Sequence, residues 1–509
     1  MQELAQALLL EVVASRRLTT DTFAAFHGCA LWDVDLSFVP GVTDAWLDAF
    51  AAAAPSAATL QRLSLRGCRG VTGAGLRRLS GCAQLRSLTL DGCTRVGDDG
   101  IASLAPLTSL VELRCEGCVL LTARALEHLQ THTRLQSLDL SMCRGVASLA
   151  PLARLTQLRC LRLGWTAATN DDVRHLCALS ALNELQLCRT RVGDDGLAVL
   201  ADALPQLHTL DMAGCPLTEA CGASLGSFPA LRALSLAGCA VGDACMAALA
   251  RGAPALRSLN LAHTRITDEG VRNSLAALPL LEDVDLECCT VSDPGVLRGC
   301  LALRRLRLCD TATNNAGVER LRGLPLNELD LSFSGITDAA LLALSPTLTS
   351  LRLDTRGVTD AGLRHLAHLS SLRRLDLFGA RVGDAGMALL VSLKHTLRAL
   401  DVCSGGVSDA GVVHVAKLTL LETLNLSQNW RITDASIAPL CSLPHVQSLG
   451  LSGTRVTGAG VLLLESLAPP TLLSLAVYGC KVAPEAAAAQ ARRPSLRITW
   501  TEEDGAADS

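Results

Sequence analysis

Aromatic residues are scarce in this chain of 509 residues. Phe, Trp and Tyr together make up 3% of the sequence, whereas hydrophobic residues as a whole make up 49%. A core with this composition is aliphatic, and leucine is the residue that supplies it. The chain also lacks Pro- or Ser-rich linkers, blocks of one charge and abrupt changes in composition. These absences argue against a string of separate domains and favour one continuous architecture.

A basic excess and a long apolar segment are also missing. The formal net charge is −4, and 45 Lys and Arg are scattered among 49 Asp and Glu, which argues against a nucleic-acid partner. No run of about 20 uncharged apolar residues occurs, which excludes a transmembrane helix. The apolar run at residues 8–14 is short, is interrupted by Glu11 and follows no basic residue, so it is not a secretory signal. We therefore expect a cytoplasmic or nuclear protein that does not bind membranes.

One pattern recurs about every 22 to 26 residues from Leu60 to Leu472. Each unit reads L-x-x-L-x-L-x-x-C, then a turn and Val/Ile-Thr/Gly-Asp, then x-Gly-Leu-x-x-Leu. Leucines at positions four and six predict a short strand with two inward side chains, and the following Thr or Asp predicts a capped helix. The eighteen units begin at Leu60, Leu85, Leu110, Leu135, Leu158, Leu182, Leu207, Leu231, Leu256, Leu281, Leu303, Leu326, Leu348, Leu372, Leu397, Leu421, Val446 and Leu472.

This pattern is that of a leucine-rich repeat. We predict an α/β fold, a right-handed leucine-rich-repeat solenoid (horseshoe) with a parallel sheet on the concave face and helices on the convex face. One unit has about seven core side chains, worth about 1.5 to 3 kcal/mol each, too little to offset the ordering of the whole unit. Units must therefore stack on one another, and the two ends of the stack require caps.

The predicted domains follow from these limits. The solenoid covers residues 29–482, and a degenerate unit precedes the eighteen regular ones. Residues 1–28 form an N-terminal helical cap, with helices expected at residues 2–14 and 20–26. Residues 483–509 form a C-terminal cap and acidic tail, with a helix at 485–492, a strand at 496–500 and a disordered end at 501–509. The unit that begins at Leu135 lacks the usual Thr-Asp-x-Gly-Leu, so it is expected to lack a regular helix.

The 21 cysteines follow the repeat rather than a pairing plan. Eight of them occupy the ninth position of their units: Cys68, Cys93, Cys118, Cys143, Cys215, Cys239, Cys289 and Cys480. Stacked side chains point the same way, and their Cβ atoms lie too far apart for disulfides. Buried, reduced thiols are therefore expected.

No enzyme, metal site or cofactor is predicted. The C-x-x-C at Cys115 and Cys118 occupies two core positions and has no second pair at zinc-finger spacing. Repeat register explains Cys288 and Cys289, and the eleven histidines are expected to be solvated at the surface. The glycines before the turn cysteines also belong to the repeat, because no phosphate-binding loop pattern follows a strand.

The layout resembles the cysteine-containing leucine-rich-repeat family, whose members include the substrate-binding halves of F-box ubiquitin-ligase adaptors. It is most similar to green-plant F-box/LRR-like proteins, through residues 18–33, 41–46, 375–382 and 424–429. The resemblance implies a protein-recognition scaffold, with a Skp1-like subunit as a further partner if an F-box is present. A complete F-box is not expected, because it is a longer three-helix unit that opens with Leu-Pro, and residues 1–28 contain no Leu-Pro.

Binding is expected on the concave face, where positions three, five and seven of the units form three outward columns. The predicted contact patch lies in the units from Leu281 to Leu397 and consists of Asp283, Asp285, Glu287, Arg305, Arg307, Asp330, Phe333, Arg352, Asp354, Asp376 and Phe378. Trp165, Trp430 and Tyr478 are further aromatic anchors near the rim, since aromatics and Arg dominate binding hot spots. The alternative is that these acids and arginines only pair across the sheet, and both interpretations stay open.

Three functions fit this pattern. The first is an adaptor or scaffold that binds a partner protein on its concave face, and it is the preferred one. The second is the substrate-recognition subunit of an SCF-type ubiquitin ligase, which would require residues 1–28 to bind a Skp1-like subunit. The third is a structural component of a large assembly.

Overall fold

The structure is a computed structural model that describes residues 2–14, 18–51 and 54–500. Its contacts divide the chain into two compact units, Met1–Asn260 and Leu261–Ser509, called unit 1 and unit 2 below. The predicted tail at residues 501–509 lies outside the described residues.

Unit 1 contains a parallel sheet of three-residue strands. Each strand pairs with the next one along the chain, and the leucine at position four lies opposite its counterpart, as Leu63 lies opposite Leu88. The strands are β1 Asp33–Asp35, β2 Arg62–Ser64, β3 Ser87–Thr89, β4 Glu112–Arg114, β5 Ser137–Asp139, β6 Cys160–Arg162, β7 Glu184–Gln186, β8 Thr209–Asp211, β9 Ala233–Ser235 and β10 Ser258–Asn260.

Unit 2 repeats this arrangement. Leu375, Leu400 and Leu424 lie opposite one another on three successive strands. The strands are β11 Asp283–Asp285, β12 Arg305–Arg307, β13 Glu328–Asp330, β14 Ser350–Arg352, β15 Arg374–Asp376, β16 Ala399–Asp401, β17 Thr423–Asn425, β18 Ser448–Gly450, β19 Ser474–Ala476 and β20 Arg497–Thr499.

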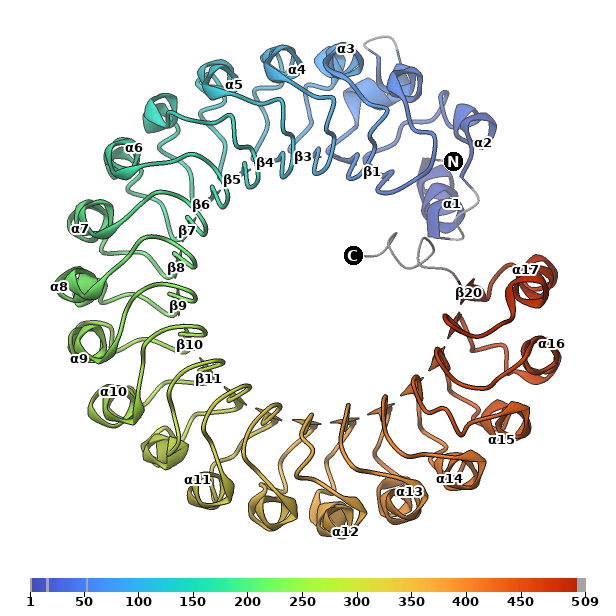
Figure 1. Cartoon of the computed structure of the whole chain (residues 1–509). Coiled ribbons are helices and arrows are strands. Elements are labelled where there is room, and N and C mark those ends of the chain that lie inside the picture. Colours follow the sequence, from blue (N-terminus) through green and yellow to red (C-terminus); the bar gives the residue numbers. More distant parts are fainter. Residues whose placement is uncertain (1, 15–17, 52–53, 501–509) are drawn as a thin grey trace. The chain divides into compact units, whose positions relative to one another are not determined.

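Helices follow the strands along the chain. In each unit taken by itself, the strands line the inner side of the curve and the helices its outer side (Figure 1). The helices of unit 1 are α1 Gln2–Ala14, α2 Thr20–Ala24, α3 Gly73–Leu76, α4 Asp98–Ala102, α5 Ala123–Leu129, α6 Asn170–Val173, α7 Asp194–Ala203, α8 Gly222–Leu225 and α9 Asp243–Gly252. Those of unit 2 are α10 Asp268–Ser274, α11 Asn315–Arg320, α12 Asp360–Leu363, α13 Asp384–Leu390, α14 Asp409–Val415, α15 Ile437–Cys441, α16 Gly458–Leu467 and α17 Ala483–Arg492.

The predicted leucine-rich-repeat solenoid is confirmed. Strands β2 to β19 fall in the eighteen predicted units, and β1 falls in the degenerate one. In the unit that begins at Leu135, a short 3₁₀ helix at Ala150–Arg154 replaces the α-helix, as expected. The units that begin at Leu281 and Leu326 have 3₁₀ helices too, at Pro294–Gly299 and Asp338–Ala343, which the repeat pattern did not predict. Such short segments favour i to i+3 hydrogen bonds.

The N-terminal helices contact the first strand and its helical segment. On α1, Gln6 accepts a hydrogen bond from the backbone N–H of Trp32 at 3.2 Å. Helix α2 ends at Ala24, two residues before its predicted end, and buries Phe23. The Phe23 ring stacks on Trp46, with ring centroids 5.0 Å apart. The aromatic residues of this region therefore form a local cluster beside the aliphatic core.

The ninth-position cysteines are hydrogen-bond donors. In each of the eight units, Sγ donates to the carbonyl at position six of the preceding unit over 3.0 to 3.4 Å. Seven of these thiols are buried, as predicted, and Cys480 is half-buried. Burial raises the pKa of Cys239 to about 11, so its thiol keeps its proton at neutral pH. The thiol thus adds a further donor to a buried carbonyl that already accepts a hydrogen bond within its own turn, as the Leu65 carbonyl does from the N–H of Cys68.

A second ladder joins the helical sides of successive units. The Asp at the start of a helical segment accepts hydrogen bonds from the backbone N–H and the hydroxyl of the Thr or Ser in the next unit, over 2.5 to 2.9 Å. The pairs are Asp44–Thr72, Asp98–Thr122, Asp194–Thr218, Asp268–Ser292, Asp338–Thr359, Asp384–Ser408, Asp409–Thr433 and Asp434–Thr457. Sequence reasoning assigned these residues to capping within one helix and missed their contact with the next unit.

This ladder predicts a loss of stability in acid. Burial tends to raise the pKa of Asp409, but hydrogen bonds from Ser436 and Thr433 outweigh it, and the pKa is lowered. A lowered folded-state pKa gives stability that is present above the ordinary Asp pKa of about 3.9 and is lost as the pH falls through the folded value. We expect Asp409→Asn to lower the free energy of unfolding by about 1 to 2 kcal/mol at pH 7. The difference in free energy of unfolding between the parent chain and the variant should be smaller at pH 3, and urea unfolding measures it. Parallel pH profiles for the two proteins would contradict this.

Candidate partner-binding surface

The outward columns predicted from the sequence are present in unit 2. We call the surface made by positions three, five and seven of the repeats in unit 2 the strand face. Strand pairing aligns its position-five residues into one row: Asp285, Arg307, Asp330, Arg352, Asp376, Asp401 and Asn425. The position-three residues form a parallel row that begins with Asp283, Arg305 and Glu328. These rows bring together residues that are about 22 to 25 positions apart in the chain.

Cross-strand ion pairs occupy the first part of the strand face. Arg305 contacts Asp283 at 2.9 Å, and Arg307 contacts Asp285 at 3.4 Å. Arg352 likewise contacts Asp330 at 3.4 Å. Each arginine thus pairs with the acid on the preceding strand, as the alternative interpretation of this pattern requires. At this exposure such a pair contributes well under about 1 kcal/mol to stability.

Three acids in successive repeats of the same face, and Glu328 on β13, differ from the others in their contacts. In the part of the chain that the structure describes, Asp354, Asp376 and Asp401 form no ion pair within 4.0 Å. Burial raises the pKa of Asp354, and the neighbouring carboxylates of Asp376, Asp330 and Asp401 raise it further. Burial is also the largest cause of the raised pKa of Asp376, and the Asp401 carboxylate raises this pKa by a smaller amount. We call Asp354, Asp376 and Asp401 the acidic trio.

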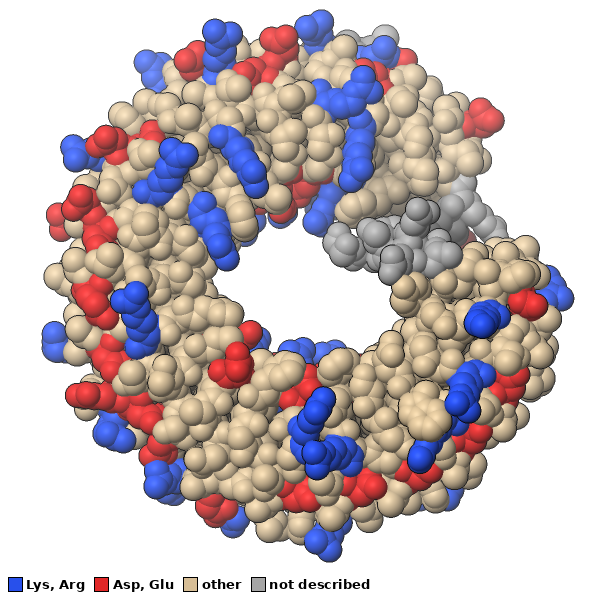
Figure 2. All heavy atoms as spheres, viewed as in Figure 1, with Lys and Arg blue, Asp and Glu red and all other residues tan. Residues whose placement is uncertain are grey.

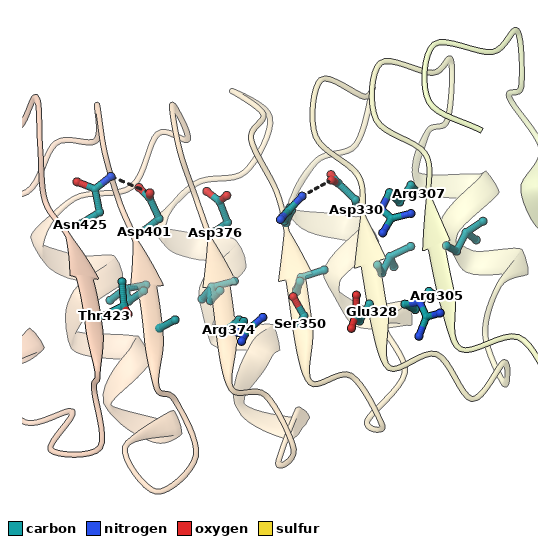
Figure 3. Close-up of a pocket in the computed structure, with 17 residues that line it drawn as sticks. Arg305, Arg307, Glu328, Asp330, Ser350, Arg374, Asp376, Asp401, Thr423 and Asn425 are labelled. Carbon is teal, nitrogen blue, oxygen red and sulfur yellow. Dashed lines mark hydrogen bonds and ion pairs between the residues drawn. The ribbon is translucent and has the colours of Figure 1, made fainter. Parts of the chain in front are cut away.

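Two hollows adjoin the acidic trio. The first has a volume of about 240 Å³ and lies over β12 to β17, with Asp376 and Asp401 in its lining. Figure 3 shows Asn425 turned toward Asp401, over a hydrogen bond of 2.8 Å, while Asp376 stands apart in the row between Asp401 and Asp330. Arg374 and Ser350 line the same hollow from position three. The first hollow therefore joins both rows of the strand face.

The second hollow is larger, with a volume of about 900 Å³. Its lining includes Asp354, Phe333 and Phe378 together with the turns that follow β13 to β16. Phe333 is 62% exposed and Phe378 is 42% exposed. Two aromatic rings thus lie open to solvent beside an unpaired carboxylate, a combination suited to a partner with both apolar and basic groups.

Position eight forms a rim beside the strand face. Except at Thr355, the residue at position eight of the eighteen repeats has a left-handed backbone, which glycine adopts at Gly379, Gly453 and Gly479 of unit 2. Other unit 2 residues hold a side chain there with φ of 51° to 63°: His263, Cys288, Asp310, Phe333, Ser404 and Gln428. Left-handed geometry costs a residue with a Cβ about 1 kcal/mol or more, so these side chains are retained against a local preference for glycine.

The structure divides the predicted patch into three groups. Arg305, Arg307, Asp330, Arg352 and Asp376 line the first hollow. Phe333, Asp354 and Phe378 line the second hollow. Asp283, Asp285 and Glu287 line neither hollow, and the first two are ion-pair partners of the arginines.

Sequence reasoning missed several residues of this surface. It omitted Arg374, Asp401 and Asn425 from the patch, although all three occupy outward positions of their units. It named Trp165 and Phe333 as anchors but did not recognise that position eight forms a continuous rim. Alignment of the repeats on their leucines would have revealed the rim, because some repeats have glycine at position eight where others have large polar or aromatic residues.

The other aromatic residues predicted as anchors lie at exposed positions as well. In unit 1, Trp165 is exposed and Arg189 stands 5.4 Å from its ring centroid. In unit 2, the guanidinium groups of Arg431 and Arg455 lie 5.2 and 5.0 Å from the ring centroid of Trp430. Both exposed tryptophan rings therefore already have a favourable contact with an arginine of the chain itself.

The charged side chains do not form a broad basic surface on the face shown in Figure 2, where acidic and basic groups are interspersed. None of the helices in the described ranges combines the length and hydropathy that a membrane crossing needs.

Comparison with known proteins agrees with this architecture. Residues 254–273, 325–345, 368–391 and 417–441 match the family model described as a leucine-rich repeat. A comparison with curated proteins gives no match. The narrower likeness to green-plant F-box/LRR-like proteins stays a prediction.

Similar solved structures include an internalin of Listeria monocytogenes, with 21% sequence identity over 74% of this chain and 82% of that one, at a TM-score of 0.38. A leucine-rich-repeat protein of Leptospira interrogans has 16% identity over 83% and 92% of the two chains, at a TM-score of 0.39. TLR13 in its complex with ssRNA13 has 18% identity over 90% and 67% of the two chains, at a TM-score of 0.42.

Proposed function

We propose that this chain is a non-enzymatic interaction scaffold that binds a partner protein on the strand face of unit 2. The observation that carries this proposal is the acidic trio, which lacks cationic partners within the described residues and adjoins exposed aromatic rings in a hollowed surface. Leucine-rich-repeat solenoids in general present extended inner surfaces to protein partners. The 21 cysteines support a reducing compartment, the cytoplasm or the nucleus.

The expected partner surface presents a basic side chain next to an apolar one. A Lys or Arg of the partner would enter the first hollow and meet Asp376 and Asp401, whose register places them on adjacent strands. An apolar group would cover Phe333 and Phe378 in the second hollow. The existing ion pairs around Arg305 and Arg307 would then border the contact rather than form its centre.

Affinity purification of the tagged full chain, with quantitative mass spectrometry, tests this function. The double variant Asp376→Asn/Asp401→Asn should lose its main partner by about tenfold or more, because two charges that the partner neutralises are removed. A matched control is Glu269→Gln/Glu319→Gln, which removes the same charge from exposed positions on α10 and α11. Equal recovery of every partner by the two variants would contradict the proposal.

The same purification distinguishes the narrower functions. Recovery of a Skp1-like subunit that depends on residues 1–28 would identify a ubiquitin-ligase substrate receptor. Salt-resistant co-sedimentation with one large particle would identify a structural component of an assembly. Recovery of a partner that depends only on the strand face corresponds to the adaptor.

A stability measurement separates binding from folding. Asp376 lies opposite Asp401, and like charges in this arrangement destabilise a sheet. A raised folded-state pKa gives stability that is present at low pH and is lost as the pH rises through the folded value, so the ionised carboxylate is unfavourable at pH 7. We therefore expect Asp376→Asn to stabilise the chain by about 0.2 to 1 kcal/mol while weakening partner recovery. Urea unfolding at pH 7 measures this, and a destabilised variant would show that the carboxylate serves the fold.

A further inference from the structure

Three side chains with different metal-binding atoms converge on the rim of unit 2. His263 and Cys288 occupy position eight of successive units, and Glu287 directly precedes Cys288. A ring nitrogen of His263, a carboxylate oxygen of Glu287 and Sγ of Cys288 all lie within 4.8 Å of one another. The three side chains are exposed or half-buried, so an ion can reach them from solvent.

The distances approach those of a coordination sphere. His263 Nε2 lies 3.8 Å from Glu287 Oε1. Bond lengths of about 2.0 to 2.3 Å place the donor atoms of a tetrahedral zinc site about 3.3 to 3.8 Å apart. No separation in the cluster exceeds this range by more than about 1 Å, which small rotations of exposed side chains can close.

The backbone holds these residues in place. The N–H of His263 donates to the Glu287 carbonyl at 2.7 Å, and the N–H of Cys288 donates to the Cys309 carbonyl at 2.9 Å. Both residues have a left-handed φ, 57° for His263 and 56° for Cys288. Other units place glycine at this position, so the fold itself does not require an imidazole or a thiol here. Two costly backbone conformations in adjacent units present two ligand types to the same point.

We propose that His263, Glu287 and Cys288 bind one divalent transition-metal ion of the zinc class. Imidazole, thiolate and carboxylate together suit Zn²⁺ and Co²⁺, whereas Ca²⁺ and Mg²⁺ prefer sites made of oxygen alone. On binding, the Cys288 thiol releases its proton to solvent and the thiolate bonds to the metal. Asp310 lies outside the cluster, but its carboxylate is 3.4 Å from Cys288 Sγ and is positioned to accept a hydrogen bond from a metal-bound water that fills the fourth position.

The local charges favour a cation. Glu287 on the strand face and Asp310 on the rim are two acids of this region, and Arg307 on β12 is directed to Asp285 and Asp283 rather than to the cluster. A bound ion would also replace the weak His263–Glu287 contact and the hydrogen bond between Cys288 and Asp310. The competing explanation is that these two contacts only pair the polar groups of the four side chains with one another and that no ion binds. Metal titration distinguishes the two explanations.

Co²⁺ titration of the purified, reduced full chain tests the proposal without any partner, so its outcome is independent of the proposed function. We expect about one equivalent of Co²⁺ to bind, with a near-ultraviolet thiolate-to-metal absorption that Zn²⁺ displaces and Mg²⁺ does not. Cys288→Gly should abolish this absorption, and His263→Gly or Glu287→Gln should weaken Zn²⁺ binding by about tenfold or more.

Glycine is the informative replacement because it relieves the left-handed backbone, so both glycine variants should fold at least as well as the parent. Ser404→Gly is the matched control, since Ser404 has the same rim position and a φ of 59° but lies outside the cluster. It should keep Zn²⁺ affinity and the Co²⁺ absorption unchanged. Absence of the thiolate absorption in the parent chain, or its persistence in Cys288→Gly, would overturn the assignment.

Discussion

Replacement of Asn429 by alanine should lower the free energy of unfolding by about 3 kcal/mol. Asn429 is 1% exposed and occupies the ninth position, where eight of the eighteen repeats have a cysteine. Its amide nitrogen donates to the carbonyls of Val402 and Leu426 at 2.8 and 2.9 Å. Its amide oxygen accepts from the backbone N–H of Val407 at 3.0 Å. Alanine would remove the bonds made to the Leu426 carbonyl and the Val407 N–H and one of two donors to the Val402 carbonyl, and each buried group left without a partner costs about 1 to 3 kcal/mol.

The chain offers its own control for this substitution. Asn429→Cys should recover about 1 kcal/mol relative to alanine, because a ninth-position thiol can donate to the Val402 carbonyl as Cys289 donates to Leu261. The cysteine cannot accept from Val407 in the same way, so recovery stays partial. Urea unfolding followed by circular dichroism measures the three proteins. Equal stability of the alanine and cysteine variants would show that the thiol hydrogen bond contributes nothing.

Leu400→Ala is expected to destabilise the chain by a similar amount, about 2 to 5 kcal/mol. Leu400 is 1% exposed and lies between Leu375 and Leu424 on the neighbouring strands. Truncation removes buried apolar surface and leaves a cavity that two adjacent units line. Because each unit is stabilised by its neighbours, hydrogen exchange should increase over β15 to β17 more than elsewhere.

A volume-conserving variant shows whether the cavity is the cause. Leu400→Met should lose less than about 1.5 kcal/mol, because methionine fills nearly the same space. If alanine and methionine destabilise the chain equally, side-chain shape rather than cavity volume determines the loss. If alanine costs less than about 1 kcal/mol, the neighbouring units close over the gap.

The strands were predictable because the repeat has one dominant signal. Leucines two residues apart, such as Leu424 and Leu426, have to face the same side of a strand, and the unit length places each set beside the next. The helical segments were less predictable. Pro294 and the shortened half of its unit give a 3₁₀ helix, where the repeat pattern alone indicated an α-helix.

The binding surface was predictable only in outline. Outward columns follow from strand periodicity, which placed Asp354, Asp376 and Phe378 on the strand face. Which acids are paired does not follow from periodicity, because Arg352 has acids on both neighbouring strands and contacts Asp330. The choice depends on side-chain geometry in the folded sheet, and it leaves Asp376 without an ion pair among the described residues.

The amino-acid sequence by itself determined the repeat length, the inward leucines, the parallel strands and the ninth-position thiols, because each depends on contacts that recur in every unit. Only the tertiary structure decided which charges are neutralised and which side chains meet on the rim. His263 and Cys288 are 25 residues apart with no motif between them, and they become neighbours because successive units stack in register. Local periodicity specifies the scaffold, whereas the sites arise from non-repeated residues that stacking brings together.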